Sequence, residues 1–175
     1  MKPVQLSANQ LNIFVGGPIQ YALGEKGFDQ PLKNSIALVI EQLLSKKYNV
    51  FSAHLDEKFG VDTYLFTPDR VTQRDYAWMQ SCDAFIALLP GSQDGLPYRT
   101  DGTHVELGWA SALQKPIIVL THKHCVEKLS HLVRGLNQLT PVIIADIQEV
   151  LASEAYLSQL LCRLTARRAE PVLSA

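Results

Sequence analysis

Five short, mostly apolar stretches recur along the chain, separated by segments in which apolar residues have helical spacing. They are residues 11–15, 48–53, 84–89, 116–120 and 141–145. A strand with one face in water alternates apolar and polar residues, whereas a continuous apolar run is typical of a strand covered on both faces. The pattern therefore predicts an α/β fold: a doubly wound, five-stranded parallel sheet, flavodoxin-like or Rossmann-like.

Helix signals fill the intervening segments. Asp29 is a suitable N-cap, and Pro31 follows it in the first turn of a helix predicted to reach about residue 44. Thr67 and Pro68 begin a second helix that is predicted to end near residue 81. Further helices are predicted over residues 103–114, 125–132 and 147–168, while residues 20–30 and 56–66 are predicted to be irregular.

Length and composition limit the number of domains, the class of protein and its possible partners. The 175 residues predict one domain over residues 11–168, with a loose lead-in (1–10) and a tail (169–175). Apolar residues at 47% and charged residues at 19% indicate a globular chain with its own core. A net charge of −1 gives no basis for binding nucleic acid or a membrane surface. Cys82, Cys125 and Cys162 form no disulfide framework, which favours the cytoplasm.

Glu106 lies where a glycine-containing loop runs into a predicted helix, between two predicted buried strands. Open α/β sheets bind ligands at the carboxyl ends of their strands, so Glu106 is a candidate nucleophile. A second interpretation is equally open from the pattern alone. Thr103-x-x-Glu106 has the spacing of a capping box, in which the glutamate accepts from the amide of the N-cap residue. Either way, the helix dipole is expected to keep Glu106 ionised.

Asp75 occupies an apolar face of its helix, because Val71 and Met79 lie four residues before and after it. A carboxylate on a buried face is costly unless it is paired or functional, and burial raises its pKa as a general acid requires. The alternative is a structural acid bonded to Arg74 or to a backbone amide. Together, Asp75 with a raised pKa and Glu106 with a lowered one would divide the acid and nucleophile roles.

Other polar groups give weaker signals. Gly16 and Gly17 end the first strand and could let a ligand approach the backbone, although neither the dinucleotide fingerprint nor a P-loop is present. Arg134, followed by Gly135, could reach a phosphate or a partner subunit, or simply end a helix. The cluster of His122, His124, Cys125 and His131 fits no zinc spacing, so no metal and no cofactor are predicted.

Several blocks, in this order, resemble the nucleoside 2-deoxyribosyltransferase family. They are residues 13–18 (IFVGGP), 74–83 (RDYAWMQSCD), 101–103 (DGT), 106–110 (ELGWA) and 115–117 (KPI). The family includes enzymes that exchange bases on 2′-deoxynucleosides and hydrolases of (deoxy)nucleoside 5′-monophosphates. The resemblance implies that Glu106 attacks C1′ to form a glycosyl-enzyme. It also implies that Asp75 protonates the departing base.

The resemblance also implies a binding site for a nucleoside or nucleotide. Its candidate residues are Gly16, Gly17, Thr100, Asp101, Gly102, Ser130 and Arg134. By the same resemblance, Ser130 contacts the 5′ end of the substrate from a neighbouring subunit, which implies a homodimer or higher homo-oligomer.

Two alternative functions remain open. Phe14 stands where the family often has a tyrosine, and Pro18 and Gln20 stand where the hydrolase branch has a serine and an arginine. These differences would suit a nucleotide sensor on the same fold that has lost catalysis. An NAD glycohydrolase that uses a glutamate is the third interpretation. The sequence leaves open the base, the sugar, the 5′-phosphate and the choice between hydrolysis and transfer.

Overall fold

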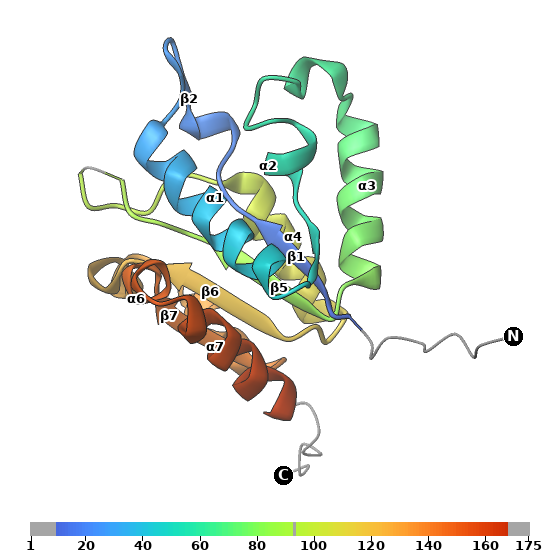
Figure 1. The fold of residues 1–175 in the computed structure, drawn as a ribbon, viewed down its shortest axis with the longest axis vertical. Coiled ribbons are helices and arrows are strands. Elements are labelled where there is room, and N and C mark those ends of the chain that lie inside the picture. Colours follow the sequence, from blue (N-terminus) through green and yellow to red (C-terminus); the bar gives the residue numbers. More distant parts are fainter. Residues whose placement is uncertain (1–9, 93, 168–175) are drawn as a thin grey trace, which may run out of the picture.

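The fold is a five-stranded parallel sheet with helices on both faces (Figure 1). A computed structural model describes residues 10–92 and 94–167, so most of the predicted lead-in and the predicted tail lie outside the described residues. The strand order is β4-β1-β5-β6-β7. The bounds are β1 (Asn12–Gly16), β4 (Asn49–Phe51), β5 (Ala84–Leu88), β6 (Ile117–Thr121) and β7 (Val142–Asp146). The predicted doubly wound, flavodoxin-like order is confirmed.

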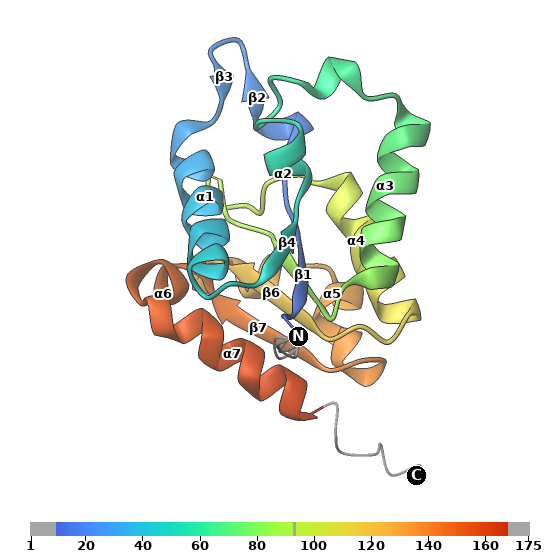
Figure 2. The ribbon, with the colours of Figure 1, turned by 45° about the vertical axis from the view of Figure 1, so that its right-hand side comes forward.

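Two hydrophobic cores lie on opposite faces of the sheet, each beneath one of the two layers of helices that Figure 2 shows. On one face α1 (Gln30–Ser45), α6 (Ile147–Ala152) and α7 (Glu154–Arg167) pack against the strands. On the other face α3 (Pro68–Ser81), α4 (Asp101–Ala112) and α5 (His131–Gly135) do so. Successive residues of β1 enter opposite cores, since Ile13 belongs to the first and Phe14 to the second.

The starts of α1 and α3 follow the predicted caps. The Asp29 carboxylate accepts from the Leu32 amide at 2.9 Å, and the Thr67 hydroxyl accepts from the Arg70 amide at 3.4 Å. Each side chain satisfies one of the amides that a helix start leaves without a partner. The Thr67 cap begins α3, the helix that carries Asp75.

Several boundaries differ from the predicted ones. Helix α4 begins at Asp101, two residues earlier than predicted, with Thr100 as its N-cap. The predicted closing helix is two helices, because Ser153 is extended (φ −145°, ψ 109°) and ends α6. The predicted helix over residues 125–132 is a 3-10 helix, Lys123–Lys128, followed by the short α5. Helix ends depend on the backbone conformation of single residues such as Ser153, which the sequence pattern does not specify.

Two segments predicted to be irregular contain short elements. Residues 20–30 hold a 3-10 turn (Gln20–Ala22) and the hairpin of β2 (Leu23–Gly24) and β3 (Gly27–Phe28). The segment over residues 56–66 begins at the last residue of α2 (Ala53–Asp56) and holds a second 3-10 turn (Thr63–Leu65). Both segments follow the carboxyl ends of strands, β1 and β4. Among the described residues, no helix combines the length and the apolar character needed to cross a membrane.

Candidate active site

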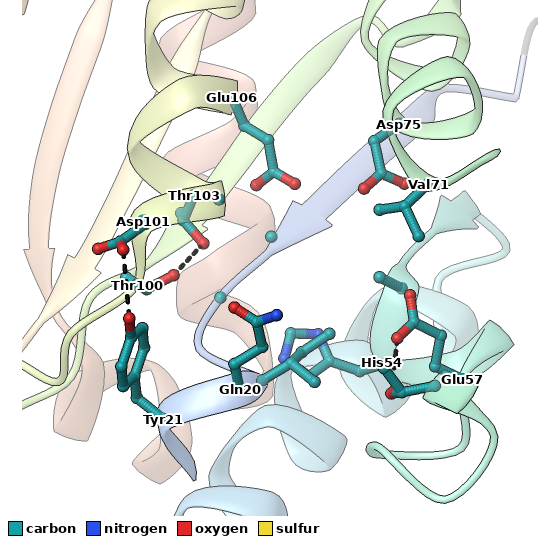
Figure 3. A pocket seen from close by; sticks show the side chains of 16 residues that line it. Gln20, Tyr21, His54, Glu57, Val71, Asp75, Thr100, Asp101, Thr103 and Glu106 are labelled. Carbon is teal, nitrogen blue, oxygen red and sulfur yellow. Dashed lines mark hydrogen bonds between the residues drawn. The ribbon is translucent and has the colours of Figure 1, made fainter. Parts of the chain in front are cut away.

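A cavity of about 210 Å³ lies beyond the carboxyl ends of β1 and β4 (Figure 3). The 3-10 turn after β1, helix α2, helix α3 and the start of α4 supply its walls. Seven of the nine predicted site residues line it: Gly16, Gly17, Asp75, Thr100, Asp101, Gly102 and Glu106. The structure therefore brings the two candidate catalytic carboxylates into one cavity.

Glu106 enters the cavity from α4, with its carboxylate directed toward the side from which Asp75 projects (Figure 3). The side chain is buried, and its Oε2 has no hydrogen-bond partner among the described residues. Burial and, secondarily, the charge of Asp75 raise the pKa of Glu106 from 4.5 to about 8, against the opposing effect of Arg74. The carboxyl group is thus poised to change protonation near neutral pH.

Two expectations for Glu106 are wrong. The capping-box interpretation fails because Thr100, not Thr103, is the N-cap of α4, and Glu106 is not hydrogen-bonded to a cap amide in the described structure. The pKa is raised, not lowered by the helix dipole. The helix dipole acts mainly on groups in the first turn of a helix. Because α4 starts earlier than predicted, Glu106 lies beyond that turn, and burial has the larger effect on its pKa.

Gly16 makes room for the nucleophile candidate. A Cβ on Gly16 would overlap Oε2 of Glu106 and would lie 3.1 Å from the Phe85 ring. Real Cβ contacts are rarely so short, so any side chain at Gly16 must displace the carboxylate. The first-strand glycine thus has a steric role that the sequence pattern alone did not assign.

Asp75 enters from α3 and is 7% exposed. Its Oδ1 accepts from Arg74 Nε at 2.8 Å. Burial raises the pKa of Asp75 above its ordinary value, the Arg74 guanidinium opposes this effect, and the charges of Glu57 and Asp56 add to it. Asp75 is therefore buried beside the cavity and also paired with Arg74, as the structural alternative expected, and its role as a general acid stays a prediction.

His54 was missed from the sequence, although it follows the predicted second strand directly. The ring is fully buried, with Nε2 3.2 Å from the Pro18 carbonyl oxygen and Nδ1 3.2 Å from the Ser52 hydroxyl oxygen. Because a carbonyl only accepts, Nε2 carries the proton and donates to Pro18, while Nδ1 accepts from Ser52. Burial lowers the pKa of His54 from 6.5 to about 4, so the ring is neutral.

Glu57 is a third buried carboxylate in the cavity wall and was also missed. It follows α2, inside a segment that the sequence predicted to be irregular, so no periodic pattern marked it. Glu57 Oε1 accepts from Arg74 Nη2 and Oε2 from the Thr63 hydroxyl, both at 2.8 Å. Arg74 therefore joins Glu57 to Asp75.

The rim at the start of α4 is polar. The hydroxyls of Thr100 and Thr103 are 2.6 Å apart. Arg99 binds Asp101 through two nitrogens, at 2.8 and 3.0 Å, and lies 4.3 Å from the ring centre of Tyr21. Neither lysine nor arginine is among the described residues that line the cavity. Its charged wall is therefore made of carboxylates.

Ser130 and Arg134 lie outside this cavity. Ser130 caps α5 and lines a separate, mostly apolar groove of about 540 Å³ between α4 and α5. Arg134 Nη1 binds Glu127 Oε2 at 2.5 Å. In the cluster after β6, His122 Nδ1 accepts from the Gly91 amide at 2.7 Å. Within residues 10–92 and 94–167, no three His, Cys, Asp or Glu side chains are grouped to hold a metal ion.

The arrangement suits a double displacement at an anomeric carbon. One buried carboxyl group can attack, a second can carry a proton, and a glycine leaves space beside the first.

A comparison with known protein families gives one match. Residues 21–136 match the family described as "Nucleoside 2-deoxyribosyltransferase". Among curated proteins, none matches the sequence significantly.

Solved structures share the fold. The chain is 28% identical to the Clostridium botulinum CMP N-glycosidase BcmB, with a TM-score of 0.57 over 81% of this chain and 95% of that one. It is 25% identical to BlsM, with a TM-score of 0.69 over 95% and 98%. A conserved protein from Enterococcus faecalis V583, 15% identical, matches 85% of this chain and 99% of its own with a TM-score of 0.55, which shows the fold alone.

Proposed function

This chain belongs to the nucleoside 2-deoxyribosyltransferase family, and we propose that it cleaves the N-glycosidic bond of a (deoxy)nucleoside or nucleoside 5′-monophosphate through a covalent glycosyl-Glu106 intermediate. The observation that carries this proposal is the meeting of two buried carboxyl groups, Glu106 and Asp75, in one cavity. The 28% identity to a CMP N-glycosidase supports the reaction class.

In the first step, an oxygen of ionised Glu106 bonds to C1′ while the bond from C1′ to the base nitrogen breaks. The bonding electron pair leaves with the base, and the Asp75 carboxyl group gives the base its proton. In the second step, ionised Asp75 takes a proton from water or from an incoming base. The oxygen or nitrogen so activated attacks C1′ and releases Glu106. Water gives hydrolysis, and a second base gives transfer.

The proposed reaction requires that Glu106 and Asp75 together hold one proton. With both groups protonated there is no nucleophile, and with both ionised there is no acid. Burial raises the pKa of both carboxyl groups, that of Glu106 to about 8, and the two titrate as a coupled pair. We therefore expect a bell-shaped pH profile whose alkaline limb marks the loss of the pair's last proton, which Asp75 holds in the reactive state.

For the 5′ end of the substrate, we propose the rim formed by Gly17, Thr100 and Gly102. Ser130 would reach this rim from a second copy of the chain. The apolar groove that holds Ser130 supports this assembly, because Leu132 in its wall is 85% exposed in the single chain. Arg134 and Asp101 are the remaining proposed contacts.

The test compares the wild-type protein with Glu106→Ala on a panel of ribo- and deoxyribonucleosides and their 5′-monophosphates, including CMP, by following base release. We expect release from at least one substrate, with a loss of at least about 10³-fold in the variant. The exposed Glu41, replaced by Gln, is the matched control and should leave the rate unchanged. A panel on which wild type and variant are equally inert contradicts the proposal, and tight nucleotide binding without turnover would indicate a sensor instead.

A further inference from the structure

Arg74 is held in one orientation by groups on three sides. Its guanidinium carbon lies 5.0 Å from the ring centre of Phe66 and 4.7 Å from that of Trp78. Its Nε donates to Asp75 and its Nη2 to Glu57, each at 2.8 Å. Charge-assisted bonds from a planar guanidinium fix geometry as well as charge, so Arg74 sets where the Asp75 carboxylate lies.

Glu57 is the other end of this arrangement. Its side chain is only 5% exposed, and the Thr63 hydroxyl donates to its second oxygen. A fully buried carboxylate that lines a reaction cavity needs its ion pair, because the desolvation cost of an unpaired charge is several kcal/mol. Arg74 therefore donates hydrogen bonds to two carboxylates with one positive charge, and its Nη1 also lies 3.9 Å from Asp56 Oδ2. The more of this charge Glu57 neutralises, the less it favours the ionised form of Asp75.

The charged groups that face Asp75 come from three elements. They are Arg74 on α3, Asp56 and Glu57 at the end of α2, and Glu106 on α4. Arg74 favours the ionised form of Asp75, whereas the negative charges of Glu57 and Asp56 favour the protonated form. A general acid must be protonated when the bond breaks, so an arginine beside it would be harmful without a compensating anion.

We propose that Glu57, acting through Arg74, is a positioning residue that holds Asp75 in place and sets how readily it keeps the proton that it delivers to the leaving base. This inference rests on the proposed function. It assigns roles to Glu57 and Arg74, which contact the acid and not the reacting atoms. One oxygen of Asp75 is anchored by Arg74, and Oδ2 keeps no hydrogen bond within the described structure, which leaves it for the substrate.

Replacing Glu57 and replacing Arg74 should shift the alkaline limb of the pH profile in opposite directions. Glu57→Gln removes an anion and keeps the side-chain volume, so Asp75 loses its proton more easily. The alkaline limb of the pH profile of kcat/KM moves to lower pH by roughly one unit. Arg74→Gln removes a cation, so the same limb moves to higher pH. In the double variant, the two shifts cancel in large part. Glu41→Gln, on the exposed side of α1, leaves the limb in place.

A purely structural role would lower kcat without moving the limb. If both single variants fold and keep the wild-type alkaline limb, or shift it in the same direction, the proposal is wrong. Arg74→Lys separates position from charge. It keeps the cation but not the two-nitrogen geometry, so we expect a lower kcat with the limb within about 0.3 units of wild type.

A carboxyl NMR titration of Asp75 in the same proteins makes the result independent of turnover. Opposite displacements of the Asp75 titration in Glu57→Gln and Arg74→Gln support the coupling even when no substrate is known, and an unmoved titration overturns it. If the coupling is observed and the wild-type protein releases no base, the proposed function fails and the coupling stands. If base is released and the limb is fixed, only the coupling fails.

Discussion

At the scale of single residues, the site is defined by polar groups whose burial costs stability. Glu106 has an oxygen without a hydrogen bond in the described structure, inside a cavity wall. A buried acceptor without a partner is destabilising, and proteins tolerate such groups mainly where a ligand will supply the missing contact. We therefore expect a bound substrate to supply the contact that this oxygen of Glu106 lacks.

Glu106→Gln should stabilise the protein at alkaline pH. The folded-state pKa of about 8 exceeds the ordinary 4.5, so wild-type stability falls as the pH rises from 4.5 through 8. The variant escapes this loss, and we expect a gain on the order of 5 kcal/mol at pH 8.5 and little difference at pH 4.5. Urea unfolding at both pH values measures it. An equal effect at the two pH values would show that the buried charge is not the cause.

Gly16→Ala should abolish most activity with a small effect on folding. The added methyl group must displace the Glu106 carboxylate, and a nucleophile moved by about 1 Å loses on the order of 10²-fold in rate. Gly24→Ala is the matched control, because its added Cβ meets nothing nearer than 3.9 Å. Base release and the thermal midpoint, measured on both variants, decide the matter. Full activity in Gly16→Ala would place the reacting oxygen elsewhere.

At the scale of elements, His54 ties two loops together. It belongs to α2, after β4, and it donates to the carbonyl of Pro18 in the turn after β1. The neighbouring strands β1 and β4 are thus joined at their carboxyl ends by a side chain as well as by the sheet. This bond joins α2 to the turn that directly follows Gly16 and Gly17 in the cavity wall.

The tie should make stability depend on pH. The pKa of His54 is about 4 in the fold against 6.5 when unperturbed, so its contribution is complete above pH 6.5 and is lost as the pH falls through 4. This loss amounts to about 3 kcal/mol. His54→Gln should lack it, so the difference in unfolding free energy between wild type and variant should shrink from pH 7 to pH 4. A difference that is the same at pH 7 and pH 4 would contradict this role of His54.

The sequence predicted strands and capped helices well because their signals are local. Asp29 and Thr67 cap the helices that they were expected to cap, and the apolar runs form the sheet in the expected order. Asp75 was found by its position on an apolar helical face. Glu57 and His54 were not found, because they lie after a strand in a segment whose shape depends on distant partners, Arg74 and Pro18.

The direction of the Glu106 pKa shift could not be predicted from the sequence either. It depends on the start of α4, which is set two residues before the residue predicted to be the cap, and on burial by other elements. Local patterns specify neither. The chemical roles of the carboxyl groups therefore needed the three-dimensional arrangement, even though their identities did not.

At the scale of the whole molecule, one chain leaves two proposed site residues away from the cavity. Ser130 and Arg134 belong to α5, and Ser130 lines the apolar groove beside α4. Helix α4 carries Glu106 into the cavity and also forms a wall of that groove through His104 and Leu107. A second copy seated on the groove would therefore lie next to the site. The cysteines Cys82, Cys125 and Cys162 are unpaired.

Leu132→Asp should lower both the assembly mass and the activity. Leu132 is 85% exposed in the single chain, and burying it against a second copy removes apolar surface from water, which a carboxylate at that place prevents. Leu44, 49% exposed on α1, offers the control when it is replaced by Asp. Light scattering after size exclusion gives the mass. A monomeric wild-type protein with full base release would contradict the assembly.

The configuration of the released sugar tests the central claim most directly. Two successive displacements at C1′, with Glu106 as the first nucleophile, restore the starting configuration, whereas direct attack by water inverts it. Turnover of a β-nucleoside or β-nucleotide in water that contains methanol gives a methyl glycoside, which does not equilibrate between anomers and is assigned by proton NMR. The account predicts the β-anomer from the wild-type protein. The α-anomer would contradict a glycosyl-Glu106 intermediate.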